Sequence, residues 1–333
     1  MQTRTSFHNK TAKQLFISNT PNFANLIYDV LTSGFGSQTK ISFISSNSSF
    51  IECMRNYLIS SSLFTPSSNN SPTTCRENCS FTDSHLTLTS SDTFASCEWM
   101  QCKGNMGGGI YTNQAGSTLT VTSCHFYDCS TNTDYGGGIA TEFLNNVYIY
   151  SSSFIHCHGG TNYHINSGGG AVFLNDTKQW HQIHDCNFIG CYSGADGGAL
   201  HLRNCKVPHS DGIANTRFID CKTVYDIDAV EGGAVQSWTV TVTCSFSNSL
   251  IARCHSYQGG GFFFQVKENY ATNIILFCLF HINTATGTGN DLAVYNLSQT
   301  DSNFFQHCFS TSQSNRVDYY DGIWYHTDHN WLP

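Results

Sequence analysis

A pair of adjacent glycines returns at nearly constant intervals through most of this chain of 333 residues. The intervals between successive pairs are 29, 32, 28, 35 and 28 residues, and a short apolar run follows each pair. Self-similarity at this period is typical of stacked repeat proteins, in which each repeat contacts mainly its neighbours. The pairs are Gly108-Gly109, Gly137-Gly138, Gly169-Gly170, Gly197-Gly198, Gly232-Gly233 and Gly260-Gly261. The chain is therefore expected to fold as a solenoid.

A second marker, Phe-x-x-Cys, follows the same period. Its clear copies begin at Phe126, Phe154, Phe188 and Phe218, and weaker copies begin at Trp99, Ile251 and Phe305. One copy, Phe280-His281-Ile282-Asn283, has asparagine in place of cysteine. Two markers that share one period indicate a true repeat.

The residues between the markers indicate β-strands. Runs such as Leu119–Thr122 and Val147–Tyr150 are rich in β-branched and aromatic residues. About 30 residues then divide into roughly three short strands joined by turns, which is one coil of a parallel β-helix. We predict an all-β, right-handed parallel β-helix of the pectin-lyase-like kind, with roughly nine coils.

One elongated domain is expected. Residues 1–103 would form an N-terminal cap with degenerate coils, residues 104–310 the regular repeats, and residues 311–333 a C-terminal cap or tail. Equivalent positions lie above one another in such a fold. The motif phenylalanines should therefore form a buried aromatic ladder, and the motif cysteines a second ladder beside it.

The sixteen cysteines have two interpretations. Disulfides would indicate a stapled secreted protein, whereas repeat-locked spacing favours buried free thiols, because stacked neighbours have parallel Cβ vectors. Pairs five residues apart, such as Cys124 and Cys129, would point to opposite faces of a straight strand and would bridge only if the chain bends. Cys75 and Cys79 lie outside the clean repeat and are the better disulfide candidates.

Charge and hydropathy argue against two kinds of partner, nucleic acid and a spanned membrane. A formal net charge of −8 argues against nucleic acid, and no apolar run is long enough to span a membrane. The first residues lack the basic region and apolar core that are typical of a signal peptide. Three explanations stay open: a sequence that lacks its natural ends, an intracellular protein, or unconventional export. We expect a monomer without cofactor or metal.

The repeat resembles a known family. Gly197-Gly198-Ala199-Leu200 and Gly232-Gly233-Ala234-Val235, together with Phe280–Asn283, look like the signature of the polymorphic outer membrane proteins of chlamydiae. They are also similar to β-helical surface repeats of parasitic protists such as trichomonads. The resemblance covers about residues 95–310. It implies a β-helix at the cell surface that serves adhesion or antigenic variation.

A binding edge is predicted where the connections between coils vary most in length. The connections after Cys157 and Cys221 are long, and insertions in a solenoid collect on one edge. The residues of this predicted edge are His158, Tyr163, His164, Tyr225, Asp226 and Asp228. They suit a glycan or a partner protein on another cell, although tolerated loop variation is an alternative. We therefore predict a non-catalytic, adhesin-like binding protein.

Two alternatives are an enzyme and a structural spacer. β-Helices also house polysaccharide lyases and glycoside hydrolases, which need clustered carboxylates. Asp196 and Glu231 each precede a glycine pair, so they should be coil neighbours, or else two solvated turn carboxylates. On the other coils this position is expected to be glycine, at Gly107, Gly136, Gly168 and Gly259. The polygalacturonase motifs are absent from the sequence.

Two histidine groups are poor candidates for metal ligands. His181 and His184 are three residues apart, as are His326 and His329. Positions i and i+3 on a strand face opposite ways, so neither pair presents its rings to one ion. Surface histidines are the simpler interpretation.

Overall fold

The computed structural model describes the repeat region and part of the C-terminal segment. The described residues are 79–160, 167–205, 212–225, 230–239, 245–266, 274–295, 305–306, 308–310, 316–320 and 323–326. All of them belong to one compact unit, Ser68–Pro333. None of these residues lies in a helix. The chain is therefore all-β over its described part.

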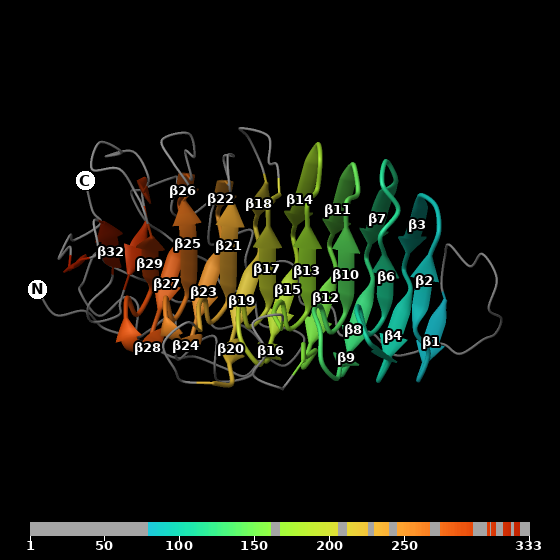
Figure 1. The fold of residues 1–333 in the computed structure, drawn as a ribbon, viewed down its shortest axis with the longest axis horizontal. Helices are drawn as coiled ribbons and strands as arrows, with labels where there is room; N and C mark the ends of the chain where they lie inside the picture. Colours follow the sequence, from blue (N-terminus) through green and yellow to red (C-terminus); the bar gives the residue numbers. More distant parts are fainter. Residues whose placement is uncertain are drawn as a thin grey trace, which may run out of the picture. The chain divides into compact units, whose positions relative to one another are not determined.

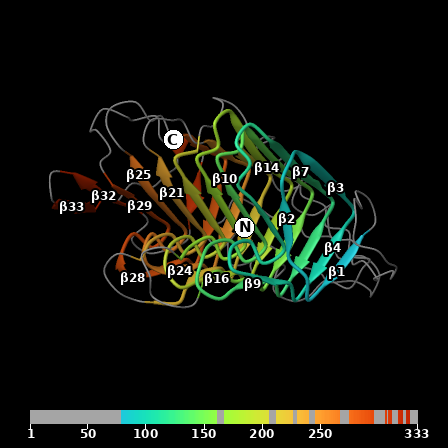
Figure 2. The same ribbon diagram turned by 45° about the vertical axis from the view of Figure 1, so that its right-hand side comes forward.

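The strands form a parallel β-solenoid, as the repeat predicts (Figure 1). Each coil sends one strand into each of three long sheets, so sequence-distant strands such as β10 and β13 lie side by side. A four-stranded and a two-stranded sheet run along a further face, which Figure 2 shows beneath β10, β21 and β25. The nine-stranded sheet has one strand per coil and agrees with roughly nine coils.

The bounds of the strands follow, sheet by sheet. The nine-stranded sheet contains β1 (Ser80–Thr82), β4 (Glu98–Met100), β8 (His125–Tyr127), β12 (Ser153–Ile155), β15 (Asn187–Ile189), β19 (Arg217–Ile219), β23 (Leu250–Ala252), β27 (Leu279–His281) and β31 (Phe309–Ser310). The ten-stranded sheet contains β2 (Leu86–Leu88), β6 (Ile110–Thr112), β10 (Ile139–Glu142), β13 (Val172–Asn175), β17 (Leu200–Arg203), β21 (Val235–Thr239), β25 (Phe262–Val266), β29 (Leu292–Tyr295), β32 (Arg316–Tyr320) and β33 (Ile323–His326). The eight-stranded sheet contains β3 (Asp92–Ala95), β7 (Thr118–Thr122), β11 (Asn146–Tyr150), β14 (Trp180–His184), β18 (Ile213–Ala214), β22 (Ser245–Ser247), β26 (Ile274–Leu276) and β30 (Phe305–Gln306). The four-stranded sheet contains β16 (Tyr192–Ser193), β20 (Lys222–Thr223), β24 (His255–Gln258) and β28 (Thr284–Thr288), and the two-stranded sheet contains β5 (Lys103–Gly104) and β9 (Ser130–Thr131).

Regular coils extend beyond the predicted repeat body. β1 and β4 precede residue 104 and already pair in register with the later coils, Phe81 opposite Trp99. At the other end β32 pairs parallel to β29, and β33 then turns back antiparallel on β32. The parallel order of the ten-stranded sheet therefore ends in a hairpin.

The glycine pairs are needed at a tight turn. Gly197 has a φ of 60°, and a Cβ on Gly198 would lie 2.1 Å from the carbonyl oxygen of Gly233 in the next coil. Neither position therefore accepts a side chain without strain. In the runs Gly107–Gly109, Gly136–Gly138 and Gly259–Gly261 the left-handed residue is the first glycine. In these three runs the structural pairs are therefore Gly107-Gly108, Gly136-Gly137 and Gly259-Gly260, one residue earlier than predicted from the sequence.

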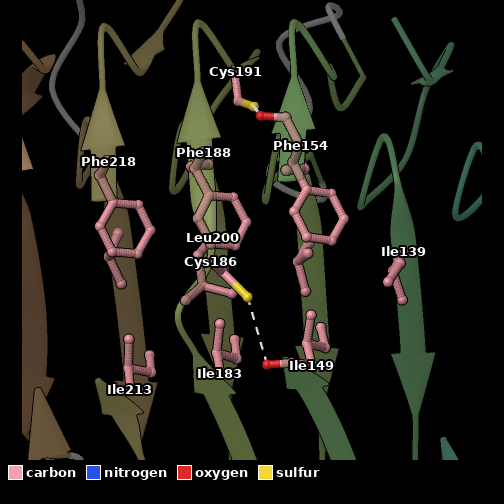
Figure 3. Packing of buried hydrophobic residues seen from close by; sticks show 14 of the residues in the cluster. Ile139, Ile149, Phe154, Ile183, Cys186, Phe188, Cys191, Leu200, Ile213 and Phe218 are labelled. Atoms are coloured by element: carbon pink, nitrogen blue, oxygen red, sulfur yellow. Dashed lines mark hydrogen bonds between the residues drawn. The ribbon is translucent and has the colours of Figure 1, made fainter. Parts of the chain in front are cut away.

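The buried aromatic ladder is confirmed (Figure 3). Phe154 and Phe188 stack with their ring centroids 4.9 Å apart, and Phe188 and Phe218 have the same separation. Trp99 stacks on Phe126 at 4.4 Å and so extends the ladder toward the N-terminus. In-register stacking lets identical rings lie parallel, and each such pair adds about 0.5–1.5 kcal/mol beyond its buried area.

The ladder cysteines are free thiols, as the repeat spacing favours. Each thiol donates to main-chain carbonyls of its own and the preceding coil, as Cys191 Sγ does to the Phe154 oxygen at 3.4 Å. The buried free cysteines are Cys97, Cys102, Cys124, Cys129, Cys157, Cys186, Cys191, Cys205, Cys221, Cys254, Cys278 and Cys308. Cys79 is disulfide-bonded, whereas Cys75 lies outside the described residues.

Cysteines five residues apart face the same way, contrary to the straight-strand expectation. Cys124 and Cys129 are both fully buried, with Phe126 between them. Asp128 has a φ of 51°, so it adds a left-handed residue after the strand and returns the next side chain to the interior. The chain therefore bends without forming a bridge.

Candidate functional site

The predicted edge follows the four-stranded sheet. His158 is in register with Tyr192 of β16, and Tyr192 with Lys222 of β20. Tyr225 lies two residues beyond β20 and is half-buried. The other predicted edge residues, Tyr163, His164, Asp226 and Asp228, lie outside the described residues.

His158 and Tyr192 form a stacked pair on this edge. Their ring centroids lie 4.8 Å apart at an interplanar angle of 11°, and both side chains are half-buried. Burial lowers the pKa of His158, so the ring is neutral at physiological pH. Its Nδ1 atom is buried without a hydrogen-bond partner. The pair thus forms a half-buried stack of two rings along this edge.

The stacked pair has charged and polar neighbours. Lys222 follows Tyr192 in register and is exposed, and His255 follows Lys222. His255 Nδ1 lies 2.9 Å from the Thr284 hydroxyl on the next coil. The same column begins at the exposed Lys103, so the edge combines rings, two exposed cations and hydroxyl groups along successive coils.

A second candidate site contains Asp196 and Glu231, which lie on adjacent coils as predicted. The amide of Gly197 donates to the Glu231 carbonyl at 2.8 Å. The same column continues through Tyr135, Gly168 and Gln258. Only Gly168 of the four predicted glycine equivalents is correct, because in the other three runs the predicted residue (Gly107, Gly136 or Gly259) occupies the left-handed position itself.

Burial perturbs both carboxyl groups. It raises the pKa of Asp196 to about 7, although the Glu231 main-chain N–H and the charge of Arg203 oppose this shift. Burial and the neighbouring Asp196 raise the pKa of Glu231 well above its usual range. Gln236 Nε2 donates to Glu231 Oε2 at 3.4 Å, whereas Asp196 Oδ1 is buried without a partner. The pair therefore holds at least one proton near neutral pH.

β17 supplies two further groups to this site. His201 is 2% exposed, and its two ring nitrogens have no hydrogen-bond partner. Gly168 lies between Tyr135 and Asp196 in this column and has no side chain. The His201 imidazole occupies the space that a side chain there would take, since a Cβ on Gly168 would lie 2.3 Å from His201 Nδ1. Burial lowers the pKa of His201 to about 3, which keeps the ring neutral.

Arg203 lies at the far end of β17 from the turn. Its guanidinium packs 5.4 Å from the ring centroid of Trp238 and forms a side-chain hydrogen bond with Tyr135. Sequence reasoning found the two carboxylates from their column but missed His201 and Arg203. These two residues could not be placed from the sequence because the register of β17 with β21 was not known. That register puts Arg203 beside Trp238.

Chemically, this arrangement combines a protonated carboxyl group, a second carboxyl group and a cation. Such a set can donate a proton to a leaving oxygen and stabilise developing charge. It does not form a metal cluster, since the described residues contain no group of three or more His, Cys, Asp or Glu side chains that suits an ion. His181 points into the core, whereas His184 points outward.

Comparisons with protein-family models, with curated proteins and with solved structures give no match for this chain. Its class is therefore defined by its own fold, a parallel β-solenoid with a buried thiol ladder. Over the described part of the chain, no helix is long and apolar enough to cross a membrane.

Proposed function

We propose that this protein is a non-catalytic, adhesin-like β-solenoid that binds a glycan along the edge of its four-stranded sheet. The observation that carries the proposal is the stacked pair of His158 and Tyr192, whose rings lie 4.8 Å apart and are half-buried. Ring faces contact the C–H faces of sugars, and neighbouring polar groups bind their hydroxyls.

The setting of the pair supports binding rather than chemistry. His158, Tyr192 and Lys222 come from successive coils, so the edge presents a row of groups to an extended ligand. Repeat proteins use such extended surfaces for recognition. A cell-surface location is part of the proposal and follows from the resemblance of the repeat. A partner protein is the other ligand class that the edge suits.

Glycan-array binding by the full chain tests this function. We expect at least one glycan whose binding falls at least tenfold in His158→Ala and Tyr192→Ala. Tyr127→Ala is the matched control, because Tyr127 is 41% exposed on the nine-stranded sheet. Equal binding by native and edge-variant chains would refute the edge as the site.

A second candidate function is glycan cleavage at Asp196 and Glu231. It is favoured by the unpartnered Asp196 Oδ1 atom and by the raised pKa values of both groups, which active sites commonly show. Release of reducing ends from polysaccharides, measured in the same samples, tests it. Turnover that disappears in Asp196→Asn and Glu231→Gln would establish an enzyme. Neither binding nor turnover would leave a structural spacer.

A further inference from the structure

The outer face of the eight-stranded sheet carries aromatic side chains that neither candidate site uses. β7, β11 and β14 pair residue for residue, so their outward side chains form a grid of three strands by three positions. The grid, here called the aromatic face, consists of Thr118, Thr120, Thr122, Asn146, Tyr148, Tyr150, Trp180, Gln182 and His184.

Three large rings gather on two neighbouring strands of this face. Trp180 is 45% exposed, and Tyr148 and Tyr150 stack with their centroids 6.1 Å apart. His184 packs against the edge of Tyr150 at 5.6 Å. The Tyr150 hydroxyl donates to Gln182 Oε1 at 2.6 Å, which fixes the position of both side chains. The Tyr150 ring is therefore held in place, while Tyr148 and Tyr150 stay half-buried and Trp180 is exposed.

The solenoid itself does not require rings at these positions. The equivalent positions on the neighbouring coils hold Thr122 on one side and Ala214 and Ser247 on the other. Coils with small residues at the position of Tyr150 and His184 thus stack in the same register. Exposed large rings that cluster on one face mark an interaction site more often than single exposed ones do.

The chemistry of the aromatic face selects the ligand. None of its nine side chains is an aspartate, glutamate, lysine or arginine. A charged glycan, a nucleic acid or an anionic lipid would find no complementary charge there. The amides of Asn146 and Gln182 and the threonine hydroxyls can instead bind hydroxyl groups beside the rings.

We propose that the aromatic face is a second binding site and that it takes a neutral oligosaccharide. Sugar rings would lie on Trp180 and Tyr148, and their hydroxyls would bind the Gln182 amide and the neighbouring threonines. The site lies on a different sheet from the edge with His158 and Tyr192, so the two can be tested independently.

Titration of the full chain with neutral oligosaccharides of hexose and N-acetylhexosamine units, followed by calorimetry, tests this inference. We expect saturable binding that falls at least tenfold in Trp180→Ala. Gln182→Glu keeps the rings but adds a charge, and it should also weaken binding at least tenfold. Tyr127→Ala should bind like the native chain, and Tyr192→Ala at the edge should keep the binding that Trp180→Ala removes.

Three results would overturn the proposal. They are no binding of any neutral oligosaccharide, binding that Trp180→Ala leaves unchanged, and concentration-dependent self-association that Trp180→Ala abolishes. The last would identify a second copy of the chain as the occupant. Circular dichroism and thermal unfolding of each variant separate loss of binding from loss of fold.

Discussion

Asn283 continues the column of ladder cysteines directly above Cys254. Its Oδ1 accepts the Cys254 main-chain N–H at 2.9 Å, and its Nδ2 donates to the Ile251 carbonyl at 3.0 Å. The same Nδ2 donates to Asp291 Oδ1 at 2.9 Å. One amide therefore makes the carbonyl contact that each thiol makes and also binds a buried carboxylate.

Removal of this amide should weaken the fold. Asn283→Ala leaves a buried N–H, a carbonyl and a carboxylate oxygen without that partner, which costs about 1–3 kcal/mol. Urea unfolding should show the loss as a lower midpoint. Asn187 lies outward on β15, so Asn187→Ala serves as the control and should change little. Equal stability of the native and Asn283→Ala chains would contradict the role of the amide.

The second glycine of each pair should resist substitution for steric reasons. In Gly198→Ala the new Cβ would lie 2.1 Å from the Gly233 oxygen and 2.5 Å from the Lys222 oxygen. We expect a loss of several kcal/mol or failure to fold, because main-chain atoms of two coils would have to separate. Gly116→Ala is the comparison, since Gly116 has a φ of 83° but open space at its Cβ. It should cost only about 1–2 kcal/mol of left-handed strain.

The pKa of Asp196 predicts a pH dependence of stability. The folded chain holds this proton up to about pH 7, whereas an unfolded aspartate loses it near its ordinary value of 3.8. The contribution of Asp196 is therefore fully present below pH 3.8 and is lost as the pH rises toward 7. Asp196→Asn stays neutral, so it should exceed the native chain in stability at pH 8 by about 1–3 kcal/mol.

Urea unfolding between pH 4 and 8 checks this prediction. Asp185→Asn is the control, because Asp185 is exposed at a turn and has a φ of 57°, which asparagine tolerates. We expect the native chain to lose stability relative to Asp196→Asn between pH 4 and 7. A relative gain in stability over this range would contradict the prediction.

The thiol ladder should be protected in the folded chain. Burial raises the pKa of Cys157 well above its usual range, and the side chain has no exposed area. Thiol reagents should therefore label the twelve buried free cysteines only after unfolding. Tyr127→Cys places a thiol at an exposed position and should react at once. Rapid labelling of Cys157 in the native chain would show that the coils open.

The stacked columns could be predicted from the sequence because period alone fixes them. Phe154 and Phe188 share a motif position, and a solenoid places equal positions above one another. The same logic placed Asp196 beside Glu231. It failed at Gly107–Gly109, because three identical residues leave the register ambiguous until the positive φ of Gly107 is known.

Other features could not be predicted from the sequence, because they depend on backbone conformation and on contacts between coils. The inward turn of Cys129 requires left-handed Asp128, and the same motif position holds residues as different as His156 and Ile282, so the residue type does not reveal that conformation. His201 reaches the acid pair only because Gly168 leaves room for its ring. The face with Trp180 and Tyr148 is visible only when two strands 34 residues apart are put in register, Tyr148 opposite Gln182.

Glycan binding by the edge with His158 and Tyr192 is the central functional claim. The most direct measurement is a glycan array probed with the native chain and with Tyr192→Ala, with reducing-end release recorded from every bound polysaccharide. We predict at least one glycan that the native chain binds and that Tyr192→Ala binds at least tenfold more weakly, with no reducing ends released by either chain. Equal binding of every glycan by the native and Tyr192→Ala chains would contradict the claim, and reducing-end release that stops in Asp196→Asn would instead make this β-solenoid a glycan-cleaving enzyme.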